Sequence, residues 1–221
     1  MPAKNKLKIY GEGVFYHAYN RGHNQQIIFK DDHDYKTFLY LLRKYLEPGF
    51  KLEKYTPKGE KILVEANHVY NEVDLLAFCL MPNHFHLLLY QKSLRGMPKL
   101  LIRLCSNYST YLNHKYETTG TPFQGTYKAV PLKNENQLKH VSRYIHANPL
   151  EFAGAKGLAS YQYSSYPLYL KGNNPSWLKT SRVINLFKSP ITYRNYVEDF
   201  IKMNDGERSE TIGNINSLTL E

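Results

Sequence analysis

The sequence predicts an α+β fold in which helices cover an antiparallel, ferredoxin-like sheet. Its apolar periodicity follows the order strand, helix, strand, strand, helix, strand, which is the order of that fold. Residues 73–80 are almost continuously apolar, and a short Met-Pro-Asn segment separates them from a second apolar run at 84–89. These two runs therefore form a tight hairpin of two adjacent strands.

The first strand and the first helix follow from composition and capping. Residues 14–20 are rich in aromatic side chains and suit a strand. Asp31 and Asp32 are candidate N-caps for a helix that runs to about Leu46, where a Pro-Gly pair ends it. The apolar positions between these limits recur at helical spacing.

The second half of the fold contains two more helices and a strand. Pro98 suits the first position of a helix that reaches Tyr116, with an apolar stripe on one side and a basic, polar stripe on the other. Residues 127–132 form the last core strand. Asn134 caps a further helix, and Asn148 belongs to its last turn at most, because the proline that follows disfavours helical geometry there.

At 221 residues, the chain is long enough for one core with a small appendage. We expect residues 1–203 to form a single domain. Lysines surround a Thr-Pro-Lys-Gly turn within residues 50–71, which we interpret as an inserted hairpin arm or a long loop. Residues 204–221 are polar, have little to bury and are expected to form a flexible tail.

The composition favours a polyanionic partner and argues against a membrane protein. The net charge is +10, and twenty tyrosines and ten phenylalanines offer surfaces on which single-stranded bases can stack. No apolar run approaches the roughly 20 residues that a bilayer span requires. Cys79 and Cys105 lie in apolar segments, as reduced core cysteines of a cytoplasmic protein do.

His84 and His86 are the first candidate site residues. Residues two apart in a strand point to the same face with their Cα atoms roughly 6.5 Å apart, so both imidazoles project together while Phe85 and Leu87 face a core. Two imidazoles at this spacing can share one divalent metal. Two alternatives are a half-exposed strand with no ligand and a structural zinc site that includes Cys79, for which no fourth ligand is evident.

Four segments together resemble one known family. They are 17–29, which begins His-Ala-Tyr-Asn-Arg-Gly, 80–86 (Leu-Met-Pro-Asn-His-Phe-His), 123–128 (Phe-Gln-Gly-Thr-Tyr-Lys) and 144–149 (Tyr-Ile-His-Ala-Asn-Pro). With these segments the chain resembles the single-tyrosine HUH transposases of bacterial insertion sequences, and most of all the branch of REP-associated tyrosine transposases. The arm within 50–71 looks longer than is usual in that family.

The resemblance implies an HUH endonuclease fold and a set of residue roles. His84 and His86 would ligate a divalent metal, Asn148 would be the third ligand, and Tyr144 would be the nucleophile. The partner would be single-stranded DNA with hairpin structure, and the metal Mg²⁺ or Mn²⁺, although imidazole ligands alone suit Mn²⁺, Zn²⁺ or Ni²⁺ better than Mg²⁺. The sequence leaves open whether the chain acts as a monomer or as a homodimer.

The chemistry explains why a tyrosine nucleophile would need a metal. A tyrosine hydroxyl has a pKa near 10 and attacks an anionic phosphodiester poorly at neutral pH, which a bound cation offsets. Attack by Tyr144 would leave a 5′-phosphotyrosine and a free 3′-hydroxyl, so the strand could be rejoined without ATP. Tyr108 and Tyr111 lie on an apolar helix stripe, whereas Tyr16 and Tyr19 have no candidate ligand one turn away.

Basic residues in polar surroundings are the candidate DNA contacts. They are Arg21, Arg103, Lys128 and Arg143. The same helical pattern places Arg143 and His146 on the outer side of the helix that carries Tyr144. The main alternative function is a module that derives from such a transposase and binds DNA or RNA hairpins without cutting them. The presence of both histidines, the tyrosine and the asparagine argues against this alternative, because binding alone needs none of them.

Overall fold

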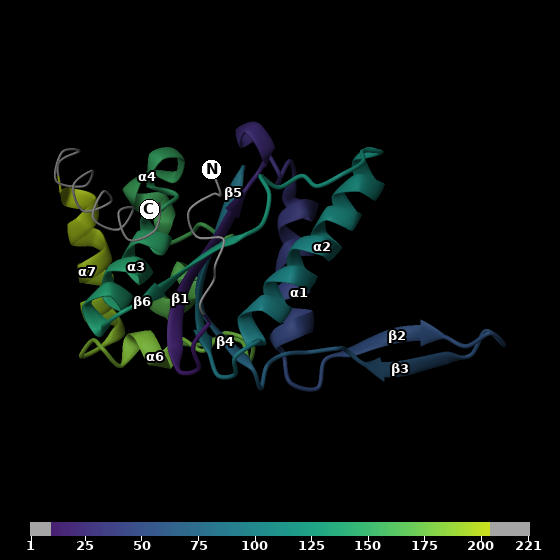
Figure 1. Ribbon diagram of the computed structural model, residues 1–221. Coiled ribbons are helices and arrows are strands. Elements are labelled where there is room, and N and C mark those ends of the chain that lie inside the picture. Colours follow the sequence, from purple (N-terminus) through teal and green to yellow (C-terminus); the bar gives the residue numbers. More distant parts are fainter. Residues whose placement is uncertain (1–9, 204–221) are drawn as a thin grey trace.

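The computed structural model describes residues 10–203, which form a four-stranded antiparallel sheet with helices on both faces (Figure 1). The strands are β1 (Val14–Arg21), β4 (Val73–Met81), β5 (His84–Gln91) and β6 (Lys128–Leu132), in the order β4-β5-β1-β6. With the helices α1 (Asp32–Leu46) and α2 (Gly96–Tyr116), they follow the ferredoxin-like order, in which the first and third core strands are central. The predicted fold class is confirmed.

Alternation along β5 separates its side chains into two sets. Phe85, Leu87 and Leu89 are fully buried in the core that the sheet forms with α1 and α2. His86 and Leu88 point to the opposite face, because successive residues of a strand alternate in direction. The β4–β5 hairpin thus places the two histidines of the Met-Pro-Asn-His-Phe-His segment away from the larger core.

The helices α1 and α2 cover the first face of the sheet. Of the two candidate caps, Asp31 is the N-cap of α1, and it forms a reciprocal capping box with Asp34. The helix α2 begins at Gly96, two residues before the expected Pro98. Gly96 packs so closely on the preceding segment that a Cβ there would lie 2.2 Å from the carbonyl oxygen of Glu72. This approach explains why the first turn of α2 contains a glycine.

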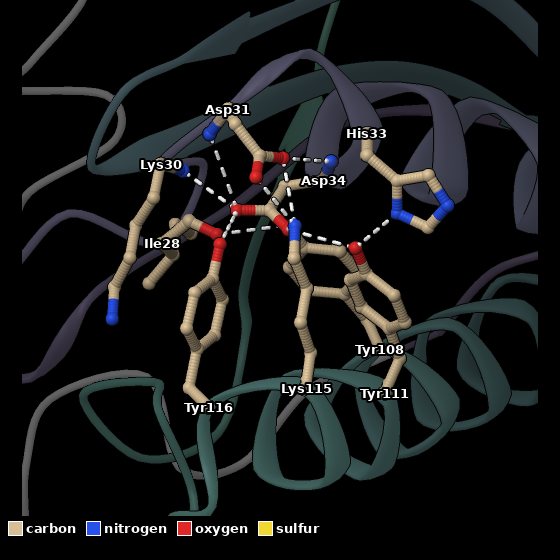
Figure 2. A network of polar contacts seen from close by, with 9 residues as sticks. All are labelled: Ile28, Lys30, Asp31, His33, Asp34, Tyr108, Tyr111, Lys115 and Tyr116. Carbon is tan, nitrogen blue, oxygen red and sulfur yellow. Dashed lines mark hydrogen bonds and ion pairs between the residues drawn. The ribbon is translucent and has the colours of Figure 1, made fainter.

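A network of polar contacts joins the start of α1 to the last turn of α2 (Figure 2). The carboxylate of Asp34 is fully buried and accepts hydrogen bonds from Tyr111, Lys115, Tyr116 and the backbone N–H of Lys30. Burial alone would raise the pKa of Asp34, but these hydrogen bonds outweigh it and lower the pKa from its usual 3.8. A buried carboxylate with a full set of donors is compatible with an ordered core.

The remaining helices form a second layer on the other face. The helix α3 (Glu135–Ala147) packs against the sheet, with Asn134 as its N-cap as predicted, and α7 (Pro190–Lys202) packs on α3. Shorter helices complete the second layer, namely α4 (Leu150–Leu158), α5 (Tyr166–Lys171) and α6 (Ser181–Ile184). A 3-10 turn, His23–Gln25, follows β1.

The second layer corrects the expected outer side of α3. His146 is fully buried, and its ring nitrogens lie 2.6 Å from the hydroxyl of Tyr193 and 2.7 Å from that of Ser165. Arg143 is also buried, with its guanidinium over two aromatic rings of α7. The prediction that both side chains face solvent is wrong, because α5 and α7 cover this side of α3.

Two short strands form a separate hairpin. The strands β2 (Lys51–Tyr55) and β3 (Lys61–Glu65) pair only with each other and extend away from the body of the protein beside α1 and α2 (Figure 1). The division of the chain into one domain over 1–203 with an arm stays a prediction, and the expected tail at 204–221 lies outside the described residues. Within residues 10–203, no helix is long and apolar enough to cross a membrane.

Candidate active site

A row of polar side chains crosses the end of the sheet on the face that α3 covers. His86 of β5 pairs with Tyr19 of β1, and Tyr19 pairs in turn with Lys128 of β6. His84 and Arg21 form the next pair toward the edge. Residues that pair directly in antiparallel strands point to the same face, so all five side chains belong to one surface.

The end of α3 brings Tyr144 and Asn148 onto this surface. The ring of Tyr144 meets the ring of His86 almost at a right angle, with 5.4 Å between the ring centroids. The side-chain amide of Asn148 donates to the carbonyl oxygen of Tyr144 at 2.9 Å, and its Oδ1 lies 3.5 Å from Nε2 of His84. The structure thus brings together the two histidines, the tyrosine and the asparagine that the sequence selected.

The hydrogen-bond partners of His84 define which ring nitrogen is free. Asn83 and Asn148 each donate their amide N–H to a backbone carbonyl, which turns the side-chain oxygen of each asparagine toward His84. Nδ1 of His84 lies 2.6 Å from Oδ1 of Asn83, a distance that requires the proton on Nδ1. The neutral ring then presents a bare Nε2 to Oδ1 of Asn148, and two acceptors that face each other attract a cation.

His86 also has one ring nitrogen engaged and one free. Its Nδ1 lies 2.8 Å from Nε2 of His17, a buried residue of β1. Its Nε2 is buried and has no hydrogen-bond partner. The sequence analysis gave His17 no role, although His17 opens the first family segment and, two residues before Tyr19, shares its face of β1.

Burial keeps the groups of this site uncharged. It lowers the pKa of His84, against the opposing effect of its Asn148 contact, and the nearby charge of Arg21 adds to the lowering. The pKa of His86 is well below its usual value because of burial and two neighbouring imidazoles. Burial also raises the pKa of Tyr144, although the Asn148 hydrogen bond opposes it. Neutral imidazoles are the form in which histidine binds metals.

The donor set fits a divalent cation bound by two imidazoles and one amide. Neighbouring ligands about 2.1 Å from one octahedral ion lie roughly 3 Å apart, close to the 3.5 Å between Nε2 of His84 and Oδ1 of Asn148. The unpartnered Nε2 of His86 is the third donor. Between residues 10 and 203, no three His, Cys, Asp or Glu side chains gather as a metal site, so the amide oxygen of Asn148 is needed to complete the set.

The alternative zinc site with Cys79 does not fit. Cys79 pairs with His86 across the β4–β5 hairpin and so shares its face, but the thiol is fully buried and contacts the sulfur of Met81 at 3.7 Å. Burial raises the pKa of Cys79, which opposes the thiolate form that zinc requires.

A comparison with models of known protein families shows the family of this chain. A model described as an IS200-like transposase matches residues 32–148, just over half of the chain. The chain belongs to the family of IS200-like transposases. The matched segment begins with α1 and ends at Asn148, so it contains His84, His86 and Tyr144.

A solved structure supports the fold of this transposase. The structure of a REP-associated tyrosine transposase bound to a REP hairpin is similar to it with a TM-score of 0.52 and 12% sequence identity. The match covers 80% of this chain and 91% of the other. A search of curated protein sequences found no matching relative.

The four basic residues that the sequence analysis selected in this transposase lie in different places. Arg21 and Lys128 line a groove beside the candidate metal ligands, and Gln124 contacts the guanidinium of Arg21. Arg103 lies on α2, across the sheet, where it donates to the carbonyl oxygen of Asn67 at 2.9 Å. Arg143 is buried and cannot serve as the outer phosphate contact that was expected.

Proposed function

We propose that this transposase cuts and rejoins single-stranded DNA through a covalent bond to Tyr144, with a divalent cation on His84, His86 and Asn148. The proposal is carried by two acceptors that face each other, Nε2 of His84 and Oδ1 of Asn148, and by the unpartnered Nε2 of His86, whose ring lies against that of Tyr144. A surface that only bound DNA would have no use for a buried, unpartnered nitrogen.

The cation would be Mg²⁺ or Mn²⁺, with water and substrate oxygens completing its shell. When bound, it would offset the negative charge that develops on the scissile phosphate. The side chains of His84 and His86 hold their Nε2 atoms in place through the contacts of their Nδ1 atoms. Asn148 connects the ligand group to α3, because its amide also donates to the backbone of Tyr144.

Tyr144 would act as the nucleophile. Its hydroxyl oxygen would form a bond to phosphorus while the bond from phosphorus to the 3′ oxygen breaks, which leaves a 5′-phosphotyrosine. The phenol proton is transferred overall to the departing 3′ oxygen, which becomes a 3′-hydroxyl. Attack by another 3′-hydroxyl reverses the sequence and regenerates the phenol. Because burial raises the pKa of Tyr144, its hydroxyl remains protonated until substrate is in place.

The groove next to this site would hold the DNA strand. Arg21 lies two residues after Tyr19 on β1, and Lys128 pairs with Tyr19 from β6, with its Nζ 5.8 Å from the centre of the Tyr19 ring. Both line the groove and would contact phosphates. The strand could then continue from the groove to the phosphate at Tyr144. The related REP-associated tyrosine transposase was solved with a hairpin, and we propose a DNA hairpin next to a single strand as the substrate here as well.

The decisive experiment compares two tyrosines of the same surface. Wild type, Tyr144→Phe and Tyr19→Phe are incubated with 5′- or 3′-labelled single-stranded DNA hairpins and Mn²⁺, and a denaturing gel detects a covalent complex. Wild type and Tyr19→Phe should form it, whereas Tyr144→Phe should bind the same DNA and form none, because only the attacking oxygen is missing.

Two outcomes would contradict the proposal in different ways. A covalent complex with Tyr144→Phe but not with Tyr19→Phe would make Tyr19 the nucleophile. Tight hairpin binding by wild type with no covalent complex under any divalent metal would identify the chain as a binding module without cleavage.

A further inference from the structure

His17 and His86 form a buried pair of neutral imidazoles on adjacent strands. Nε2 of His17 lies 2.8 Å from Nδ1 of His86, and the two rings lie edge to edge and nearly parallel, with 5.0 Å between their centroids and 23° between their planes. His17 is 1% exposed and His86 is 6% exposed. Burial lowers the pKa of His17 to about 3 and that of His86 well below its usual value, so neither ring carries a charge.

Only one proton can lie between the two rings. If His86 donates from Nδ1, its Nε2 is bare and His17 has its proton on Nδ1. If His17 donates from Nε2, the proton of His86 is on Nε2 and blocks that nitrogen. In both arrangements Nδ1 of His17 and Nε2 of His86 lack a partner, as the structure has them. A cation at Nε2 of His86 is compatible with the first arrangement alone.

We propose that His17 is a positioning residue whose Nε2 accepts the Nδ1 proton of His86 and so holds Nε2 of His86 ready for the metal. This inference rests on the metal site proposed above. The second ligand has the same arrangement, because Nδ1 of His84 is engaged by Oδ1 of Asn83. An acceptor behind the ligand fixes the ring orientation and makes the ligating nitrogen more basic.

The first test measures metal binding without DNA or activity. Calorimetric titration with Mn²⁺ is applied to wild type, His17→Phe and His17→Gln. His17→Phe keeps an aromatic ring but offers no acceptor, and its Mn²⁺ affinity should fall by roughly 10- to 100-fold. His17→Gln can place an amide oxygen near the position of Nε2 and should bind Mn²⁺ more tightly than His17→Phe.

A buried histidine outside the site is the matched control. His146 is equally buried, but its two nitrogens contact Tyr193 and Ser165 on the far side of α3. His146→Gln should leave Mn²⁺ affinity unchanged. Wild-type Mn²⁺ affinity in His17→Phe would overturn the inference, as would equal losses in His17→Phe and His17→Gln. If wild type itself binds no Mn²⁺, the proposed metal site fails first.

The second test uses the wild-type protein, so it does not depend on whether the His17 variants fold. Long-range ¹H–¹⁵N NMR of wild type loaded with Mg²⁺ shows which nitrogen of each imidazole is protonated. The inference expects both His17 and His86 to carry the proton on Nδ1. A proton on Nε2 of His17 would mean that His17 donates rather than accepts, and would overturn the inference even if both substitutions prevented folding.

Discussion

On the α1–α2 side of the sheet the buried carboxylate of Asp34 accepts hydrogen bonds from five residues, whereas on the α3 side two buried imidazole nitrogens have no partner. The described residues contain four buried side-chain polar atoms without a partner. Two of the four belong to His17 and His86, next to Tyr144. The unpaired atoms are therefore concentrated at the candidate site.

This difference shows which face is built for stability and which for chemistry. An unpaired buried polar atom costs about 1–3 kcal/mol, so a chain selected for stability alone would pair it or replace it. Asp34 shows that this fold can satisfy a demanding buried group when it stabilises helix packing. On the other face, Nε2 of His86 is useful only if something binds it. The two faces should therefore respond differently to substitution.

The largest effect is expected from a metal ligand on the α3 side. His86→Leu replaces the imidazole with an apolar side chain of similar size and so removes Nε2. The rate of covalent complex formation should then fall by roughly 100-fold or more. Thermal stability should change little, because the substitution removes one unsatisfied polar atom, Nε2 of His86, and leaves one in its place, Nε2 of His17. Single-turnover gel assays and thermal melts measure both. Full activity of wild type in excess EDTA, or of His86→Leu with Mn²⁺, would show that the α3 side does not hold a metal needed for activity.

The converse substitution on the α1–α2 side should affect stability alone. Asp34→Asn removes the charge that Lys115, Tyr111 and Tyr116 surround, and should lower the free energy of unfolding by about 3 kcal/mol. The affinity for Mn²⁺ should stay at the wild-type value, because Asp34 and His86 lie on opposite faces of the sheet. Urea denaturation and calorimetric titration of the same preparation provide the two readouts. A loss of Mn²⁺ affinity without a loss of stability would contradict this prediction.

The Asp34 carboxylate should also have a smaller effect, on how the free energy of unfolding changes at acidic pH. Because folding lowers the pKa of Asp34, its ionised form favours the folded state. This contribution is complete above the usual value of 3.8 and is lost as the pH falls through the lower value of the folded protein. Asp34→Asn should therefore lose less stability than wild type between about pH 5 and 3. Urea midpoints at a series of pH values test this, and parallel curves for the two proteins would contradict it.

Strand alternation and helix periodicity were enough to place the candidate residues on common faces, whereas the roles of Tyr144 and Asn148 came from the resemblance to the transposase family. His84 and His86 share a face because they are two apart in a strand, and Tyr144 and Asn148 lie together because they are four apart at the end of a helix. The missing information concerned contacts between distant segments. His17 contacts His86 from a different strand, a pairing that depends on the register of β1 against β5.

The errors have a single physical origin. Residues 150–203 contain three short helices and α7, whose buried Tyr193, Val197 and Phe200 recur at helical spacing, but nothing in this pattern indicates that the stripe packs on α3. A polar residue on a helix is expected to face solvent when nothing is known to pack on it. Once α5 and α7 cover that side, His146 is held by two hydroxyls and Arg143 lies over aromatic rings.

The smallest predicted effect separates two basic residues on the site face from one on the other face. If Arg21 and Lys128 each contact a phosphate, either alanine substitution should reduce the slope of log affinity against log salt by about 0.7, the value for one contact to a single strand. Arg103→Ala is the matched control, because Arg103 lies across the sheet and donates to a backbone carbonyl. Its slope should equal that of wild type. Fluorescence anisotropy with a labelled single-stranded hairpin between about 50 and 200 mM salt gives these slopes. The slope counts the phosphates that a side chain neutralises, wherever that side chain lies on the protein. A reduced slope for Arg103→Ala alone would therefore mean that the DNA binds on the α1–α2 side.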